Sequence, residues 1–100
     1  KIMFMVLKED IQNLLFKCEK ILEANEINFK RLRKEEKMLS KVLKDYELAD
    51  DNAITYNEIV NRQQDVIKEL VKLKTDEKNI KKVITKIRPL LTSMEVISNL

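Results

Sequence analysis

The sequence predicts an all-α protein in which one long continuous helix forms an extended coiled coil. Three observations favour this fold class. The 100-residue chain contains no glycine, which sheet proteins need in turns with positive φ. Charged residues make up 37% of the chain, against about 25% in an ordinary globular domain. Apolar residues recur in alternating steps of three and four residues from Phe4 to Leu70, which is typical of a coiled coil.

The first and longest element is a rod predicted over residues 1–88. A repeat near 3.5 residues keeps one apolar stripe facing a partner along the whole helix, and an isolated helix cannot bury that stripe. We therefore expect a homodimer, with parallel strands. The repeat continues through the poor helix formers Asp50, Asp51 and Asn52, which the pattern places on the outer face of the helix.

A second arrangement of the same helical residues stays open. Aspartate and asparagine are common helix caps, so Asp50, Asp51 and Asn52 would also suit the turn of an antiparallel helical hairpin. In that arrangement the two arms of a single chain would bury the apolar stripe against each other.

The predicted dimer seam consists of the residues at the two repeating positions of the stripe. Isoleucine and valine at one position with leucine at the other favour two parallel strands, and Asn25 within the seam would select the register. The seam residues are Phe4, Leu7, Ile11, Leu14, Cys18, Ile21, Asn25, Leu32, Leu39, Val42, Tyr46, Ala49, Ala53, Tyr56, Val60, Ile67, Leu70, Leu73, Ile80, Ile84 and Ile87.

Two features alter the rod toward its C-terminal end. After Leu70 the apolar spacing slips by three residues, which predicts a register shift with local overwinding. Pro89 lacks a backbone donor and clashes with the preceding turn of a helix. Residues 89–100 are therefore predicted to form a short helix, either kinked or separate.

A second set of apolar residues flanks the seam. A strip wider than the seam is expected when a helix contacts more than one neighbour, either a docked second protein or the other helices of a larger bundle. The predicted docking residues are Leu15, Leu22, Phe29, Met38, Leu43, Ile59, Val66 and Val71.

A basic segment covers residues 78–88, which contain five positive charges and no acidic residue. Such a segment suits an anionic partner. Nucleic acid is the weaker expectation, because the net charge is only +3 and no aromatic side chain is interleaved for stacking on bases. The possible anion contacts are Lys78, Lys81, Lys82, Lys86 and Arg88.

Catalysis, a metal site and a cofactor are not expected. The chain has no histidine, which removes the usual general base and the commonest metal ligand, and it has no glycine for an oxyanion loop. Its single cysteine, Cys18, permits no internal disulfide and is compatible with the nucleus or cytoplasm. The apolar run at residues 2–7 is shorter than the roughly 18 residues of a membrane span. Because the chain starts at Lys1, we expect it to be a fragment of a longer protein.

These patterns predict a dimerisation and protein-docking segment of a larger scaffold protein, in a cytoskeletal, spindle, chromatin or trafficking assembly inside the cell. The heptad repeat from Phe4 to Leu70 resembles the coiled-coil parts of such scaffold proteins, and this resemblance implies architecture only. The alternative function is a nucleic-acid or chromatin-associated module that uses residues 78–88.

Overall fold

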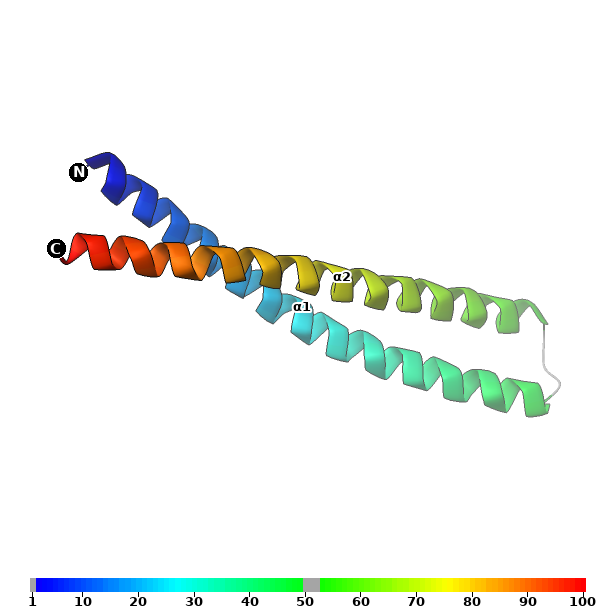
Figure 1. The fold of residues 1–100 in the computed structure, drawn as a ribbon. Coiled ribbons are helices and arrows are strands. Elements are labelled where there is room, and N and C mark those ends of the chain that lie inside the picture. Colours follow the sequence, from blue (N-terminus) through cyan, green and yellow to red (C-terminus); the bar gives the residue numbers. More distant parts are fainter. Residues whose placement is uncertain (1, 50–52) are drawn as a thin grey trace. The chain divides into compact units, whose positions relative to one another are not determined.

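The chain folds into two long helices (Figure 1). The computed structural model describes the backbone of residues 2–49 and 53–100, and the side chains of residues 2–46 and 55–100. Helix α1 spans Ile2–Ala49 and helix α2 spans Ala53–Ser98. The all-α class predicted from the sequence is therefore confirmed.

Two compact units divide the chain, and each contains a segment of both helices. Unit 1 comprises Lys1–Asn25 and Asp76–Leu100, and unit 2 comprises Glu26–Thr75. In unit 2, Phe29 on α1 lies against Lys74 on α2, whereas the later residue Glu35 contacts the earlier residue Arg62. The order of these contacts shows that α1 and α2 run antiparallel in unit 2.

Unit 1 has the same antiparallel order. Glu19 of α1 contacts Arg88 of α2 at 3.1 Å, and the earlier residue Phe4 lines a hollow together with the later residue Ile97. The first turns of α1 and the last turns of α2 therefore belong to the same end of this unit (Figure 1).

The expectation of one continuous helix is wrong, and the antiparallel hairpin that the sequence left open is the arrangement observed. The predicted turn at Asp50, Asp51 and Asn52 lies outside the described residues. The physical reason for the hairpin is that two arms of one chain meet at a high effective concentration, whereas separate chains must lose translational freedom to pair. Pairing between copies of the chain stays a prediction.

The buried face of the hairpin follows a heptad repeat on both helices, in steps of three and four residues. Every residue of this repeat is buried or half-buried. On α1 the repeat consists of Phe4, Lys8, Ile11, Leu15, Cys18, Leu22, Asn25, Phe29, Leu32, Glu36, Leu39, Leu43 and Tyr46. On α2 it consists of Tyr56, Ile59, Gln63, Val66, Leu70, Leu73, Glu77, Ile80, Ile84, Ile87, Leu91 and Met94.

The observed repeat on α1 differs from the predicted seam at every second position. The seam prediction placed Leu7, Leu14 and Ile21 inside the contact, but these residues are 54%, 46% and 48% exposed. The buried face instead uses the residue that follows each of them, and the first of these residues is the polar Lys8. Counting apolar residues favoured Leu7 over Lys8, which is why the sequence pointed to the neighbouring stripe.

The buried face of α2 also keeps one phase along the helix. Val66, Leu70 and Leu73 continue to Glu77 with the same steps, across the position where a register shift was expected. Helix α2 then continues through Pro89 to Ser98, so residues 89–100 do not form a separate helix.

The most completely buried side chains lie in unit 2. Leu32 of α1 is 2% exposed and Val66 of α2 is 1% exposed, and both pack with Leu70. The half-buried side chains Phe29, Leu39 and Leu73 surround this cluster. A two-helix unit has room for only a thin core, so these few side chains carry much of its stability.

Candidate interaction surface

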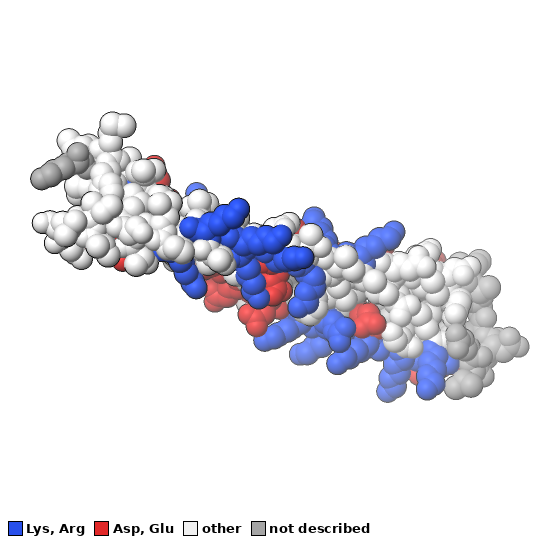
Figure 2. Space-filling model, in the orientation of Figure 1, with Lys and Arg blue, Asp and Glu red and all other residues white. Residues whose placement is uncertain are grey.

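Exposed apolar side chains are concentrated in unit 1. Among the described residues, seventeen large hydrophobic side chains are exposed, and thirteen of them belong to this unit. Residues 2–7 and 89–100 together contain one charged residue, Glu95. The end of unit 1 that holds these residues is correspondingly almost free of charge on the face shown in Figure 2. An uncovered apolar concentration of this kind is typical of an interaction site.

Six of these exposed side chains follow the heptad repeat of the two helices. On α1, Leu7, Leu14 and Ile21 are spaced seven residues apart, and each lies three residues after a member of the buried face. Helix α2 has the same spacing and the same phase, with exposed fractions of 40%, 51% and 56% at Val83, Leu90 and Ile97. Each helix of unit 1 therefore carries an apolar stripe directly beside its buried face.

Both stripes lie on the same side of unit 1. In an antiparallel pair of helices, equivalent heptad positions flank the contact on one common side. The pairing of Glu19 with Arg88 sets the level of the two helices, which brings Leu14 near the level of Leu90 and Ile21 near the level of Val83. The resulting surface is a ladder with three rungs, and we call it the apolar ladder. Its rungs are Leu7 with Ile97, Leu14 with Leu90, and Ile21 with Val83.

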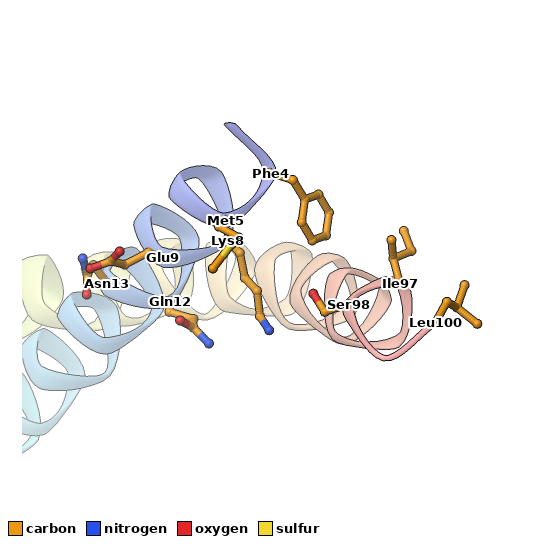
Figure 3. Close-up of a pocket in the computed structure, with 9 residues that line it drawn as sticks. All are labelled: Phe4, Met5, Lys8, Glu9, Gln12, Asn13, Ile97, Ser98 and Leu100. Atoms are coloured by element: carbon orange, nitrogen blue, oxygen red, sulfur yellow. The ribbon is translucent and has the colours of Figure 1, made fainter. Parts of the chain in front are cut away.

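A hollow at the terminal end of unit 1 is lined by residues of both helices, among them Ile97 of the ladder (Figure 3). It has a volume of about 980 Å³. Phe4 and Met5 of α1 and Ile97 and Leu100 of α2 supply its apolar lining, and the ring of Phe4 points toward Ile97. The remaining lining is polar and consists of Lys8, Glu9, Gln12 and Asn13 of α1 and Ser98 of α2.

The same heptad phase is polar where it continues into unit 2. On α1 the next two positions after Ile21 are Asn28 and Glu35, and on α2 the positions preceding Asp76 are Glu69 and Arg62. The apolar ladder is therefore confined to unit 1.

Glu35 and Arg62 form the best-defined polar contact of unit 2. Arg62 Nε donates a hydrogen bond to Glu35 Oε1 at 2.7 Å, and Arg62 Nη2 donates to Glu35 Oε2 at 3.0 Å. This bidentate hydrogen bonding lowers the pKa of Glu35 and raises the pKa of Arg62. Nearby, Gln63 Nε2 donates to Ser40 Oγ at 2.9 Å. These contacts cross from α2 to α1 and therefore align the two helices.

The residues predicted for the docking of a second protein mostly pack α1 against α2. Leu43 and Val66 are buried, and Leu15, Leu22, Phe29 and Ile59 are half-buried on the face between the helices. Only Met38 and Val71 of this set are exposed, at 60% and 61%.

The predicted seam residues fall into three groups. Buried members are Cys18, Leu32, Leu70, Ile84 and Ile87, and the exposed members are Leu7, Leu14, Ile21 and Ile67. The half-buried members are Phe4, Ile11, Asn25, Leu39, Val42, Tyr46, Tyr56, Val60, Leu73 and Ile80. The side chains of Ala49 and Ala53 lie outside the described residues.

The basic segment is partly neutralised within the chain. Lys81 pairs with Glu77 at 2.7 Å, and Arg88 pairs with Glu19 at 3.1 Å. Lys78, Lys82 and Lys86 are exposed. Two of the five predicted anion contacts therefore already have a carboxylate partner.

Sequence reasoning missed the α2 side of the apolar ladder. Val83, Leu90 and Ile97 were assigned to no site, although their spacing of seven residues is visible in the sequence. The signal was masked by Ile84, Ile87 and Leu91, whose stronger apolar pattern marks the buried face of the same helix.

The part of the chain that the structure describes lacks two other kinds of site. It contains no group of cysteine, aspartate and glutamate side chains that could hold a metal ion. None of its helices has a stretch long and apolar enough to cross a membrane.

Comparison of the chain with protein-family models, curated proteins and solved structures gives no match. Function is therefore inferred from the residues and from their exposure.

Proposed function

We propose that this chain is a non-catalytic protein-assembly module, a helical hairpin whose apolar ladder is covered by helices of a protein partner. The observation that carries this proposal is the ladder itself. Its six large hydrophobic side chains repeat with the heptad spacing on two adjacent helices, and they are 40% to 56% exposed. Helices that present such a repeat pack side by side into bundles.

The energetics favour a partner that covers more than the six ladder residues. Completing the burial of a half-exposed aliphatic side chain contributes about 1 kcal/mol, so the ladder contributes roughly 6 kcal/mol. That gain is close to the entropic cost of association, which is on the order of 4–15 kcal/mol. Met3 and Leu100 are 87% and 99% exposed and belong to the terminal end of unit 1, beside the outermost residues of the ladder. A partner helix that also covers these two side chains gains the additional burial that stable association requires.

The setting that we propose is docking within a larger scaffold assembly. An apolar face bordered by the polar residues Asn28 and Asp76 limits where a partner helix binds. A partner that slides along α1 toward unit 2 would place its apolar residues against Glu35, which is already bonded to Arg62. The border therefore favours one register of docking over the others.

The proposal is tested by photo-crosslinking in cells that produce the chain. A photo-reactive amino acid replaces Leu14 or Leu90 on the ladder, or Met38 in unit 2 as a control of similar exposure. We expect one discrete protein adduct from the two ladder positions and none from position 38. Adding Leu7→Lys should abolish the adduct, because it introduces a charge into the covered face.

Two results would contradict the proposed function. One is the absence of an adduct from either ladder position. The other is the same set of adducts from position 38 as from position 14, because a specific docking face must distinguish a ladder residue from an exposed residue of unit 2.

A further inference from the structure

We propose that the helices covering the apolar ladder belong to a second copy of this chain, which lies antiparallel across the ladder with a two-fold axis at the level of Leu14 and Leu90. This inference rests on the proposed function, and it adds the identity of the partner and the orientation in which it binds. The product is a four-helix arrangement built from unit 1 of each copy.

The first argument is the charge pattern beside the ladder on α1. Asp10 lies three residues after Leu7, and Lys17 lies three residues after Leu14, so both flank the same side of the helix. Both side chains are exposed, and neither forms an ion pair within the described residues. An acidic and a basic side chain thus stand at equivalent heptad positions on either side of Leu14.

A two-fold axis at Leu14 makes this pattern complementary to itself. The antiparallel second copy then places its Leu14 against Leu14 and its Ile21 against Leu7, and its Lys17 lies opposite Asp10. Symmetry repeats the Asp10–Lys17 pair on the other side of the axis, so one interface gains two attractive pairs. On α2, the same operation places Leu90 against Leu90 and Val83 against Ile97.

The other two-fold arrangement is disfavoured by charge. An axis parallel to the helices would place α1 of one copy over α2 of the other, with Leu14 against Leu90. Lys17 would then lie opposite Lys86, which is also exposed. That arrangement brings two like charges together twice and leaves Asp10 without a basic partner, so the antiparallel arrangement is selected.

The chain exposes more surface than a compact protein of its mass. The chain has 8023 Å² of accessible surface, whereas a compact monomer of 11.9 kDa has about 6,000 Å². A stable interface buries about 800 Å² on each partner. The surplus of roughly 2,000 Å² is spread over the whole chain, so it leaves room for an interface of this size without locating it.

Disulfide trapping of the purified chain tests the orientation. In a Cys18→Ala background, Leu14→Cys should give a covalent dimer on mild oxidation, because each residue on the axis faces its own copy. Leu90→Cys should behave in the same way, and Met38→Cys in unit 2 should not. Trapping that requires Leu14→Cys and Leu90→Cys in the same chain would instead indicate the axis parallel to the helices and would overturn the proposed arrangement.

Charge exchange tests the pairing independently by sedimentation equilibrium. Asp10→Lys should raise the dimer dissociation constant on the order of tenfold at low salt, because two attractive pairs become repulsive. Lys17→Asp should do the same, and the double exchange should restore the original constant. Asp10 and Lys17 are both exposed, so circular dichroism should show unchanged helix content in all three variants.

The failure of this inference is distinguishable from the failure of the proposed function. A chain that remains monomeric at all concentrations, or a double exchange that does not restore association, would overturn the second copy as the partner. Photo-crosslinks from Leu14 to a different protein would then still support the assembly module. A monomer without any ladder-specific adduct would overturn both proposals.

Discussion

Removal of the Leu32 side chain should destabilise the hairpin more than any comparable change on its surface. Leu32 is 2% exposed and packs against Val66 and Leu70 in unit 2. Leu32→Ala removes buried methyl groups and leaves a cavity, and such changes in protein cores cost about 2–5 kcal/mol of unfolding free energy. A core between two helices can partly close around the cavity. We therefore expect a loss of about 3 kcal/mol.

The expected loss is large relative to the total stability of the chain. Domains of this size have an unfolding free energy of about 5–15 kcal/mol, and the thin core of two helices favours the lower part of that range. A loss of about 3 kcal/mol should lower the Tm by roughly 15 °C. Thermal and urea unfolding, followed by circular dichroism, measure both quantities at one fixed protein concentration.

Met38→Ala provides the matched control for this prediction. Met38 also lies on α1 in unit 2, but it is 60% exposed. Its truncation should change the unfolding free energy by less than about 0.5 kcal/mol. Equal effects of Leu32→Ala and Met38→Ala would refute the reasoning, because the two residues would then be equally buried in solution.

Three further predictions concern pH, the helix interior and the thiol. Bonding to Arg62 lowers the pKa of Glu35 below its usual 4.5, so its stabilising contribution is present above pH 4.5 and is lost as pH falls through the lower folded-state pKa. Glu35→Gln should reduce the decrease of the urea unfolding midpoint at acidic pH. An unchanged decrease would contradict this cause. Pro89→Ala should raise the unfolding free energy by about 1–3 kcal/mol in urea titrations, because alanine restores a backbone donor inside α2. Cys18 is buried, so a thiol reagent should modify it much more slowly in the native chain than in urea, and equal rates would contradict its burial.

The repeat and the helical class were predictable from the sequence because they depend on local properties. The absence of glycine disfavoured tight turns with positive φ, and the spacing of apolar residues indicated the period of the helices. Both features survive in the structure, where the buried faces of α1 and α2 keep a heptad repeat.

The choice between a straight rod and a hairpin was not predictable from the repeat alone. A heptad pattern indicates that an apolar stripe is buried. The same stripe can pack against another chain or against the other helix of its own chain. The pair of Glu35 and Arg62 distinguishes these cases, because its partners are 27 residues apart on different helices. No local signal connects two residues at that separation.

The precise buried positions also depended on a competition between neighbouring residues. Leu7 and Lys8 differ by one position, and the structure places Lys8 on the buried face and leaves Leu7 exposed. A lysine can extend along an apolar contact while its ammonium group stays in water. Judging burial by the polarity of each residue type therefore placed Leu7, instead of Lys8, on the buried face in the first turns of α1.

The antiparallel contacts have a consequence for the order in which the chain folds. The contact between Glu35 and Arg62 closes a loop of 27 residues, whereas the contact between Glu19 and Arg88 closes one of 69. Closing the longer loop first costs about 0.8 kcal/mol more in chain entropy. We therefore expect α1 and α2 to pair in unit 2 before they pair in unit 1. Fraying should then proceed in reverse, and backbone amides near both termini should exchange their hydrogens first. The rung formed by Leu7 and Ile97 forms late in this order of events. The apolar ladder is therefore complete only on chains in which α1 and α2 have already paired in unit 1.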